Sequence, residues 1–361
     1  MNIPMIDTLT ATIDISNYEE VAKDLLNQLE DKKNEAKSLA SKYFNEKTTI
    51  VINNITFEVL ANGSKGYAYI LHNNDYEVKL SQFRSKSKDF FPVFIKIKSE
   101  ALWAYGYESS WNKIIQWINE SIGNVISNKI NRLDLCCHTD ELELNEYDYE
   151  SFKGNFHNDQ IYRFRRKVNA MVFGSRDGKV YCRIYNKTLE TKQAGKKLWF
   201  FDIWESKGMN CEKVWNIEFE VKREFFKDKK IDSVEDAFER LQTIWLYCTS
   251  EWIVKVNLDR TRIERCSVCE EWSNLQKAFS NFSDVQLISR EKQLQTDALA
   301  LVPGTIGNLT SYAARLGNND IEDVINNLMF AGGKYLKTKN LDFLKAINEK
   351  MQLLNLIIDE V

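Results

Sequence analysis

The chain of 361 residues lacks the features that would mark a membrane, secreted or strongly cationic protein. No apolar run approaches the roughly 18 residues that cross a bilayer. The N-terminal segment MNIPMIDTLTATID has neither the basic nor the apolar region of a secretory signal. The formal net charge of -3 excludes a histone-like polycation, so any binding of nucleic acid must come from local basic patches. We therefore expect a cytoplasmic protein with no membrane partner.

Cysteine is too scattered to build a disulfide framework or a zinc site. The seven cysteines are an odd number spread over a long chain, which indicates reduced thiols. Cys266 and Cys269 form a lone CxxC, whereas a structural zinc normally takes four ligands. No second cysteine pair and no histidine lies close to them in sequence, so we expect neither disulfides nor a structural zinc.

The apolar residues that are present follow helical and strand periodicities. Helices are predicted over 17–44, where Asn17 is placed to cap, and over 108–122. The alternating runs between Thr48 and Lys98, broken by Asn-Gly and Asn-Asn, predict an antiparallel meander. A further strand is expected at 131–138. The fold class is therefore α+β, with a central antiparallel sheet and flanking helices.

The second half of the chain continues this pattern and then becomes purely helical. Two strands, NAMVFGS and KVYCRIYNK, are joined by a turn at Asp177 and Gly178, and WNIEFEVKRE forms another strand before a helix over 234–254. From about Pro303 only helical patterns occur. We predict a sheet domain over 1–260, a linker region over 261–302 and a C-terminal helical module over 303–361.

Alternation along three of these strands separates an apolar face from a polar one. The polar faces carry the following residues: Tyr181, Arg183, Tyr185 and Lys187; Asn216, Glu218, Glu220 and Lys222; Arg132, Asp134, Cys136 and His138. If the strands share one sheet, Asp134, Glu218 and Glu220 can surround a hard divalent cation, Mg²⁺ or Mn²⁺. Tyr185 would lie beside it as a nucleophile. Taken alone, the same alternation is also typical of any half-exposed sheet.

The succession RLDL, FGSRDGKVYCRIYNKTLE and NIEFEVKRE resembles, in order and content, the replication initiation factor family of rolling-circle plasmid and phage initiators and related conjugative relaxases. The resemblance covers about 7–223. It implies a metal-dependent enzyme that nicks one DNA strand at an origin. Tyr185 would attack a phosphodiester, form a 5′-phosphotyrosyl intermediate and free a 3′-OH. Arg183 and Lys187 would offset the phosphate charge.

The same resemblance assigns several acidic positions. Asp134 and Glu218 match the metal-binding acids, and Lys187 and Glu190 match the residues that follow the tyrosine. The ligand role of Glu220 depends only on its face. Asp7 resembles an aspartate that often opens these domains, as a further ligand or a structural residue.

Several alternatives stay open. The more widespread histidine-based nucleases use a His-hydrophobic-His pair, and His72, His138 and His157 do not form one. A carboxylate site is therefore required, and His138 is either a proton acceptor, a metal ligand or a surface residue. Tyr181 shares the face of Tyr185, and the family pattern favours Tyr185. A conjugative relaxase and a catalytically silent origin-binding protein are the alternative functions.

The segment YRFRRK interleaves aromatic and basic residues, which suits stacking on unpaired bases and neutralising phosphates. Its candidate DNA-binding residues are Tyr162, Arg163, Arg165, Arg166 and Lys167. The expected partners are single-stranded and duplex origin DNA, and the resemblance adds a host helicase and a homodimer. The C-terminal helices would recognise duplex DNA, dimerise or dock the helicase.

Overall fold

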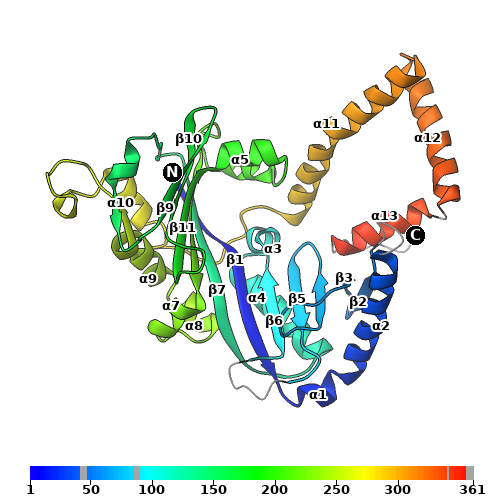
Figure 1. Cartoon of the computed structure of the whole chain (residues 1–361), viewed down its shortest axis with the longest axis horizontal. Coiled ribbons are helices and arrows are strands. Elements are labelled where there is room, and N and C mark those ends of the chain that lie inside the picture. The colour runs from blue at the N-terminus through cyan, green and yellow to red at the C-terminus, as the bar shows by residue number, and fades with distance from the viewer. Residues whose placement is uncertain (41–46, 85–89, 340, 355–361) are drawn as a thin grey trace.

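The computed structural model describes residues 1–40, 47–84, 90–339 and 341–354. Within this part of the chain, an antiparallel sheet of eleven strands forms the centre of the molecule (Figure 1). Its order is β2-β3-β4-β5-β6-β1-β7-β12-β11-β10-β9. The strands are β1 (Asn2–Ile15), β2 (Thr49–Ile52), β3 (Ile55–Val59), β4 (Tyr69–His72), β5 (Tyr76–Leu80), β6 (Val93–Ile97), β7 (Val125–Thr139), β9 (Asp159–Phe164), β10 (Lys167–Phe173), β11 (Val180–Asn186) and β12 (Trp215–Lys222). A separate pair joins β8 (Phe152–Gly154) to β13 (Ile253–Lys255).

Helices flank this sheet, so the predicted α+β class is confirmed. They are α1 (Tyr18–Val21), α2 (Lys23–Ala40), α3 (Ser99–Tyr105), α4 (Tyr107–Ser121), α5 (Lys187–Ala194), α6 (Trp199–Ser206), α7 (Arg223–Asp228), α8 (Val234–Phe238), α9 (Leu241–Leu246), α10 (Glu270–Gln276), α11 (Arg290–Leu316), α12 (Ile321–Thr338) and α13 (Phe343–Leu353). Short 3-10 turns cover Asp148–Ser151 and Ile263–Arg265, and a π-helix covers Tyr247–Trp252. None of the described helices is long and apolar enough to cross a membrane.

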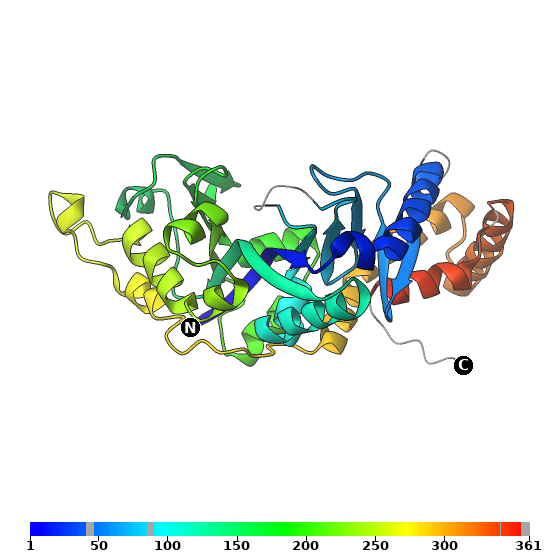
Figure 2. The ribbon, with the colours of Figure 1, turned by 90° about the horizontal axis from the view of Figure 1, so that it is seen from below.

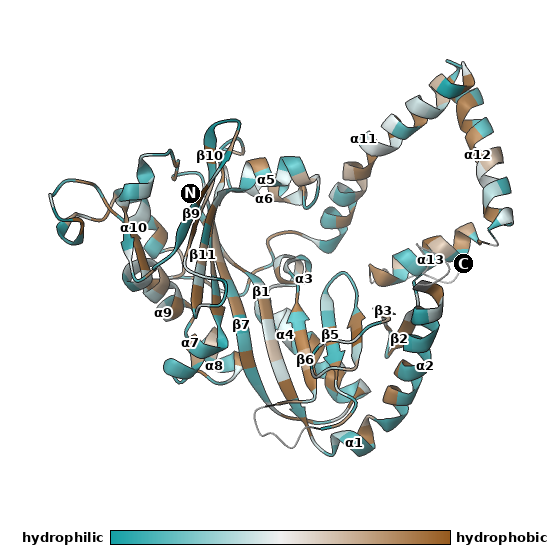
Figure 3. Cartoon of the chain, in the orientation of Figure 1, coloured by the Kyte–Doolittle hydropathy of each residue, from teal (hydrophilic) through white to brown (hydrophobic). Residues whose placement is uncertain are grey.

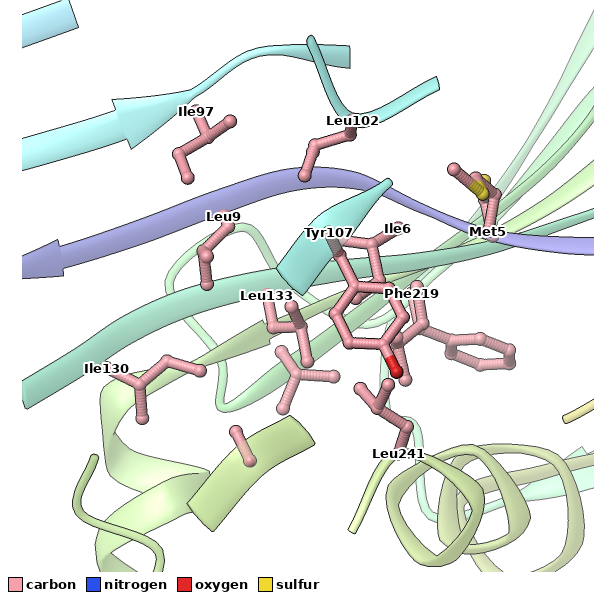
Figure 4. Packing of buried hydrophobic residues seen from close by; sticks show 14 of the residues in the cluster. Met5, Ile6, Leu9, Ile97, Leu102, Tyr107, Ile130, Leu133, Phe219 and Leu241 are labelled. Atoms are coloured by element: carbon pink, nitrogen blue, oxygen red, sulfur yellow. The ribbon is translucent and has the colours of Figure 1, made fainter. Parts of the chain in front are cut away.

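The long strands β1 and β7 join the two halves of the sheet. They pair with each other in antiparallel register, and a register shift between Ile6 and Thr8 leaves Asp7 as a β-bulge. On the apolar face, Leu9 and Leu133 pack with Phe219, Tyr107 and other buried side chains (Figure 4). This core fixes β7, β12 and β11 side by side, so the polar side chains of these strands share the opposite face.

Most of the expected elements are present, with informative differences. The meander over 48–98 forms β2 to β6, and the helix over 108–122 is α4. The helix expected over 17–44 is α1 followed by α2, and residues 41–44 lie outside the described part of the chain. Asn17 stands at the N-cap with left-handed backbone, but its side chain makes no capping bond. The helix expected over 234–254 is broken into α8, α9, the π-helix and β13.

The C-terminal helices form an arm at the opposite end of the molecule from the loop near residue 262 (Figures 1 and 2). The boundary expected at residue 303 lies inside α11, which runs through Pro303. The expected linker over 261–302 contains α10 and the start of α11, and it buries Trp272 and Leu275. Trp272 and Leu275 are spaced i, i+3 on one face of α10, but this helix is only seven residues long, so its period is too short to stand out in the sequence. At its far end the arm returns to the sheet, where the Asn74 amide donates to the Leu353 carbonyl at 3.3 Å.

Candidate active site

The three polar-faced strands lie next to one another, as the sequence-based hypothesis required. Strand β12 pairs with β7 on one side and with β11 on the other. The register sets Arg183 opposite Glu218 and Tyr185 opposite Asn216, while Glu220 lies opposite Asp134. Directly paired residues point to the same face of a sheet. The predicted catalytic and acidic side chains therefore gather in one place.

The Tyr185 hydroxyl stands at the centre of a small hydrogen-bond network. It donates to Glu218 Oε2 at 3.1 Å and accepts from Asn216 Nδ2 at 2.9 Å. Lys187 Nζ lies 3.5 Å from the same oxygen. The other carboxylate oxygen of Glu218 accepts from Arg183. A buried acceptor, a neutral donor and an ammonium group thus surround one phenol oxygen.

The surroundings of Tyr185 hold its hydroxyl in the protonated form. Burial, reinforced by the negative charges of Glu218 and Asp7, raises the pKa of Tyr185 well above its usual value, against the hydrogen bond from Asn216. A phenol with a raised pKa attacks only if a base removes its proton. Glu218 is the carboxylate within hydrogen-bond reach, and its side chain is only 3 % exposed.

Asp134 and Glu220 form a second cluster around Arg132. The Arg132 guanidinium binds both Asp134 oxygens, with Nε at 2.7 Å and Nη2 at 2.6 Å, and it also reaches Glu220 at 2.8 Å. Lys222 pairs with the other oxygen of Glu220 at 3.2 Å. Burial and the nearby Glu218 charge outweigh Arg132 and raise the pKa of Asp134 to about 7.

The expected divalent metal does not fit these residues as they stand. A hard cation needs free carboxylate oxygens, but Arg132 engages Asp134, and Arg183 engages Glu218. Arg132 and Lys222 hold Glu220 in the same way. Over the described ranges, no three His, Cys, Asp or Glu side chains form a group that could hold a metal ion. Basic side chains supply the compensating charge that Mg²⁺ or Mn²⁺ was expected to supply.

Two further residues of the site were not among the sequence-based candidates. Asn216 was placed on the polar face, but no pattern marked it as the residue that orients the Tyr185 hydroxyl. Lys197 follows the α5 helix, and the charges of Asp7 and Glu100 raise its pKa although its burial lowers it. Asp7 acts on both Tyr185 and Lys197 from its β-bulge. The resemblance had marked Asp7, whereas the contact of Lys197 with a distant segment leaves no local sequence signal.

His138 is buried, which rules out a surface residue among the three alternatives for it. It is 1 % exposed and stacks on Trp103, with Phe200 and Trp204 around it. Its Nδ1 accepts from Trp204 Nε1 at 3.1 Å. Burial, with a smaller effect of Lys187, holds the pKa of His138 well below its ordinary value. A neutral ring in an aromatic box is structural, because helices α3 and α6 from distant parts of the chain enclose it.

Tyr181, the competing nucleophile, lies in a different environment. It is 7 % exposed and pairs across the sheet with Glu220. The Arg176 guanidinium lies 5.8 Å from its ring. The hydrogen bonds that surround the Tyr185 hydroxyl come from Glu218, Asn216 and Lys187, so the geometry favours Tyr185.

The candidate DNA-binding residues lie on a protruding ribbon formed by β9 and β10 at the sheet edge. Tyr162, Arg163 and the tip residues Arg165 and Arg166 are exposed. The two tip arginines have φ of 49° and 68°, a left-handed turn that non-glycine residues rarely adopt. Arg163 points to the face opposite Tyr162 and lies 3.7 Å from Glu146.

Comparison with known proteins found one kind of similarity. No family model and no curated protein matches the chain. Among solved structures, the chain is similar to the rolling circle replication initiator protein from Geobacillus stearothermophilus. The match has 12 % identity and a TM-score of 0.46, and it covers 80 % of this chain and 100 % of the other. Similarity of this degree does not define a shared function, which is argued below from the side chains of the site.

Proposed function

We propose that the protein nicks one strand of DNA with Tyr185 as the nucleophile and thereby initiates rolling-circle replication. One observation carries this proposal: the Tyr185 hydroxyl is held between a carboxylate acceptor, Glu218, and two nitrogen donors, Asn216 and Lys187. An activated nucleophile beside its base, with cations at hand, is the arrangement that covalent catalysis needs. The ordered motifs around Tyr185 add the substrate class, a DNA strand.

The proposed first step moves one proton and exchanges one bond. Glu218 takes the proton of the Tyr185 hydroxyl while the phenol oxygen attacks phosphorus. The bond from phosphorus to the 3′ oxygen breaks, and that oxygen leaves as a hydroxyl after it receives the proton that Glu218 took from Tyr185. The 5′ phosphate stays on Tyr185. Arg183 and Lys187 lie beside Glu218 and Tyr185, where they would stabilise the charge that develops on the phosphate.

A divalent cation remains a separate part of the proposal. The carboxylates are of the right chemistry for Mg²⁺ or Mn²⁺, but binding would require Arg132 or Arg183 to release an oxygen. We therefore assign no step to a metal. The alternatives with the same fold are a conjugative relaxase, which shares this chemistry, and a silent origin-binding protein, which lacks it.

The remaining partners are also proposals. The arm exposes many large apolar side chains on α11, α12 and α13, such as Leu301, Phe330 and Leu344 (Figure 3). Exposed apolar helices suit a protein partner better than a phosphate backbone. This favours the homodimer or the host helicase over duplex DNA as the ligand of the arm.

The test is the formation of a covalent adduct. The protein is incubated with Mn²⁺ or Mg²⁺ and a labelled single-stranded oligonucleotide from its own origin, and the protein-DNA adduct is resolved on a denaturing gel. We expect Tyr185→Phe to abolish the adduct and Tyr181→Phe, the matched control on the same strand and face, to retain it. Equal adduct formation by Tyr185→Phe and the unaltered protein would exclude Tyr185 as the nucleophile.

A further inference from the structure

The β9–β10 ribbon begins in the same row of the sheet as Tyr185. Tyr162 on β9 pairs with Ala170 on β10, and Ala170 pairs with Tyr185 on β11. Paired residues share a face, so Tyr162 stands on the face that carries the nucleophile. Two strand spacings separate them, which is about 10 Å. The side chain between them is a single methyl group, so little bulk separates the Tyr162 ring from the active site along this row.

A second aromatic residue continues the line. Phe164 follows Tyr162 by two positions on β9 and therefore points to the same face. The two side chains are 49 % and 37 % exposed. The Tyr162 hydroxyl donates to Gln160 at 2.5 Å, so this hydrogen bond engages the edge of the ring. Arg165 lies 5.3 Å from the Phe164 ring, and it adds positive charge at the outer end of the line.

The spacing of the two backbone positions suits a base stacked between their side chains. Alternate residues on a strand are about 6.7 Å apart. Successive bases in a stacked strand are about 3.4 Å apart, so one base fits between the two rings with normal stacking distances on both sides. A paired base cannot enter, because its partner and its own neighbours occupy that space. The tip residues Arg165, Arg166 and Lys167 are exposed and supply charge for the adjoining phosphates.

We propose that Tyr162 and Phe164 sandwich one unpaired base of the strand that Tyr185 cuts. The inference rests on the proposed function and names the form of its substrate. A separation of about 10 Å corresponds to about three stacked nucleotides, or fewer in a stretched strand. The scissile phosphate is therefore reached only where the DNA beside it is already single-stranded. Phe164 was not among the predicted contacts, and Arg163, which was, points away from this surface.

The test uses photochemical crosslinking of an oligo(dT) strand that carries a single 5-iodo-deoxyuridine. This base crosslinks to aromatic rings on which it stacks. The protein carries Tyr185→Phe so that binding is measured without cutting. We expect the crosslinked peptide to contain Tyr162 or Phe164, and the Tyr162→Ala, Phe164→Ala double variant to lose the crosslink and bind oligo(dT) more weakly by between about fivefold and about a hundredfold.

Two variants control for trivial effects. Tyr147→Ala removes another exposed tyrosine, 79 % exposed, and should change the affinity less than twofold. Tyr162→Phe keeps the ring and should keep the crosslink. Crosslinks to other aromatic residues, or a double variant that binds as well as Tyr147→Ala, would overturn the sandwich. The adduct assay is read separately: an adduct with crosslinks elsewhere refutes only the sandwich, and a crosslink without an adduct refutes only the role of Tyr185.

Discussion

Replacing Glu218 by glutamine tests whether this carboxylate is the general base or has only a structural role. The change keeps the shape of the side chain and removes the charge that accepts the Tyr185 proton at 3.1 Å. Loss of a general base lowers a rate by about 10²–10⁴-fold. The variant also leaves Arg183 without its ion-pair partner. Because the Arg183 side chain is 36 % exposed and water can reach it, we expect a stability loss of about 1–3 kcal/mol, below the full cost of a buried unpaired charge.

The dependence of adduct formation on pH distinguishes the two roles of Glu218. The charge of Glu218 is one of the causes that raise the pKa of Tyr185, so glutamine at this position lowers that pKa. The variant should therefore be slow at neutral pH and accelerate as the pH rises, because hydroxide replaces the missing base. Glu220→Gln is the matched control, since Glu220 lies on the same face and pairs with Arg132 and Lys222. A rate for Glu218→Gln that is unchanged, or reduced equally at every pH, would refute the assignment.

Three further predictions address the surroundings of the site. If a metal binds here as proposed, Arg132 would compete with it for Asp134 and Glu220, and Arg132→Gln should lower the half-saturating Mn²⁺ concentration for adduct formation severalfold; an unchanged value would contradict this competition. Burial holds the pKa of His138 below its ordinary value of 6.5, so neutral His138 stabilises the fold fully above pH 6.5 and this stabilisation is lost as the pH falls below it. His138→Phe should therefore reduce the drop in melting temperature between about pH 8 and about pH 5. Parallel curves for the variant and the unaltered protein would contradict this. Replacing Arg165 and Arg166 by Asn and Gly, which prefer the left-handed turn, should reduce the slope of log affinity against log salt for oligo(dT) by about 1.4, and an unaltered slope would show that the tip does not contact phosphates.

Alternation was enough to predict the polar face of the site. Each strand has a period of two, so the residues that point with Tyr185 follow directly from the sequence. Alternation could not predict that β7, β12 and β11 are adjacent, because the order of strands in a sheet depends on the packing of the whole core. The order of the family motifs supplied the expectation that these strands belong together, and the register then places Arg183 opposite Glu218.

Charge pairing was the part that the sequence left open. A carboxylate on a polar face is equally suited to a metal, a cation or water, and the choice depends on side-chain reach. Arg132 lies two residues from Asp134 on the same strand, yet its guanidinium reaches both Asp134 and Glu220. The resemblance had marked Asp7, but alternation could not predict that it lies in a β-bulge. Lys197 was not predicted, because its ion pair with Glu100 joins segments that are far apart in sequence.

Under the proposed function, the balance of charge around Tyr185 predicts that a bound phosphodiester changes the site. Four carboxylates, Asp134, Glu190, Glu218 and Glu220, are paired with four cations, Arg132, Arg183, Lys187 and Lys222. A phosphodiester brings one more negative charge into this balanced cluster. Asp134 can compensate the added charge by taking up a proton, because its pKa is already about 7. Protonation would release Arg132 toward the phosphate. A divalent cation would restore the balance in the same place. Under the proposed function, proton uptake by Asp134 and metal binding would therefore be competing ways to admit the strand that Tyr185 is proposed to cut.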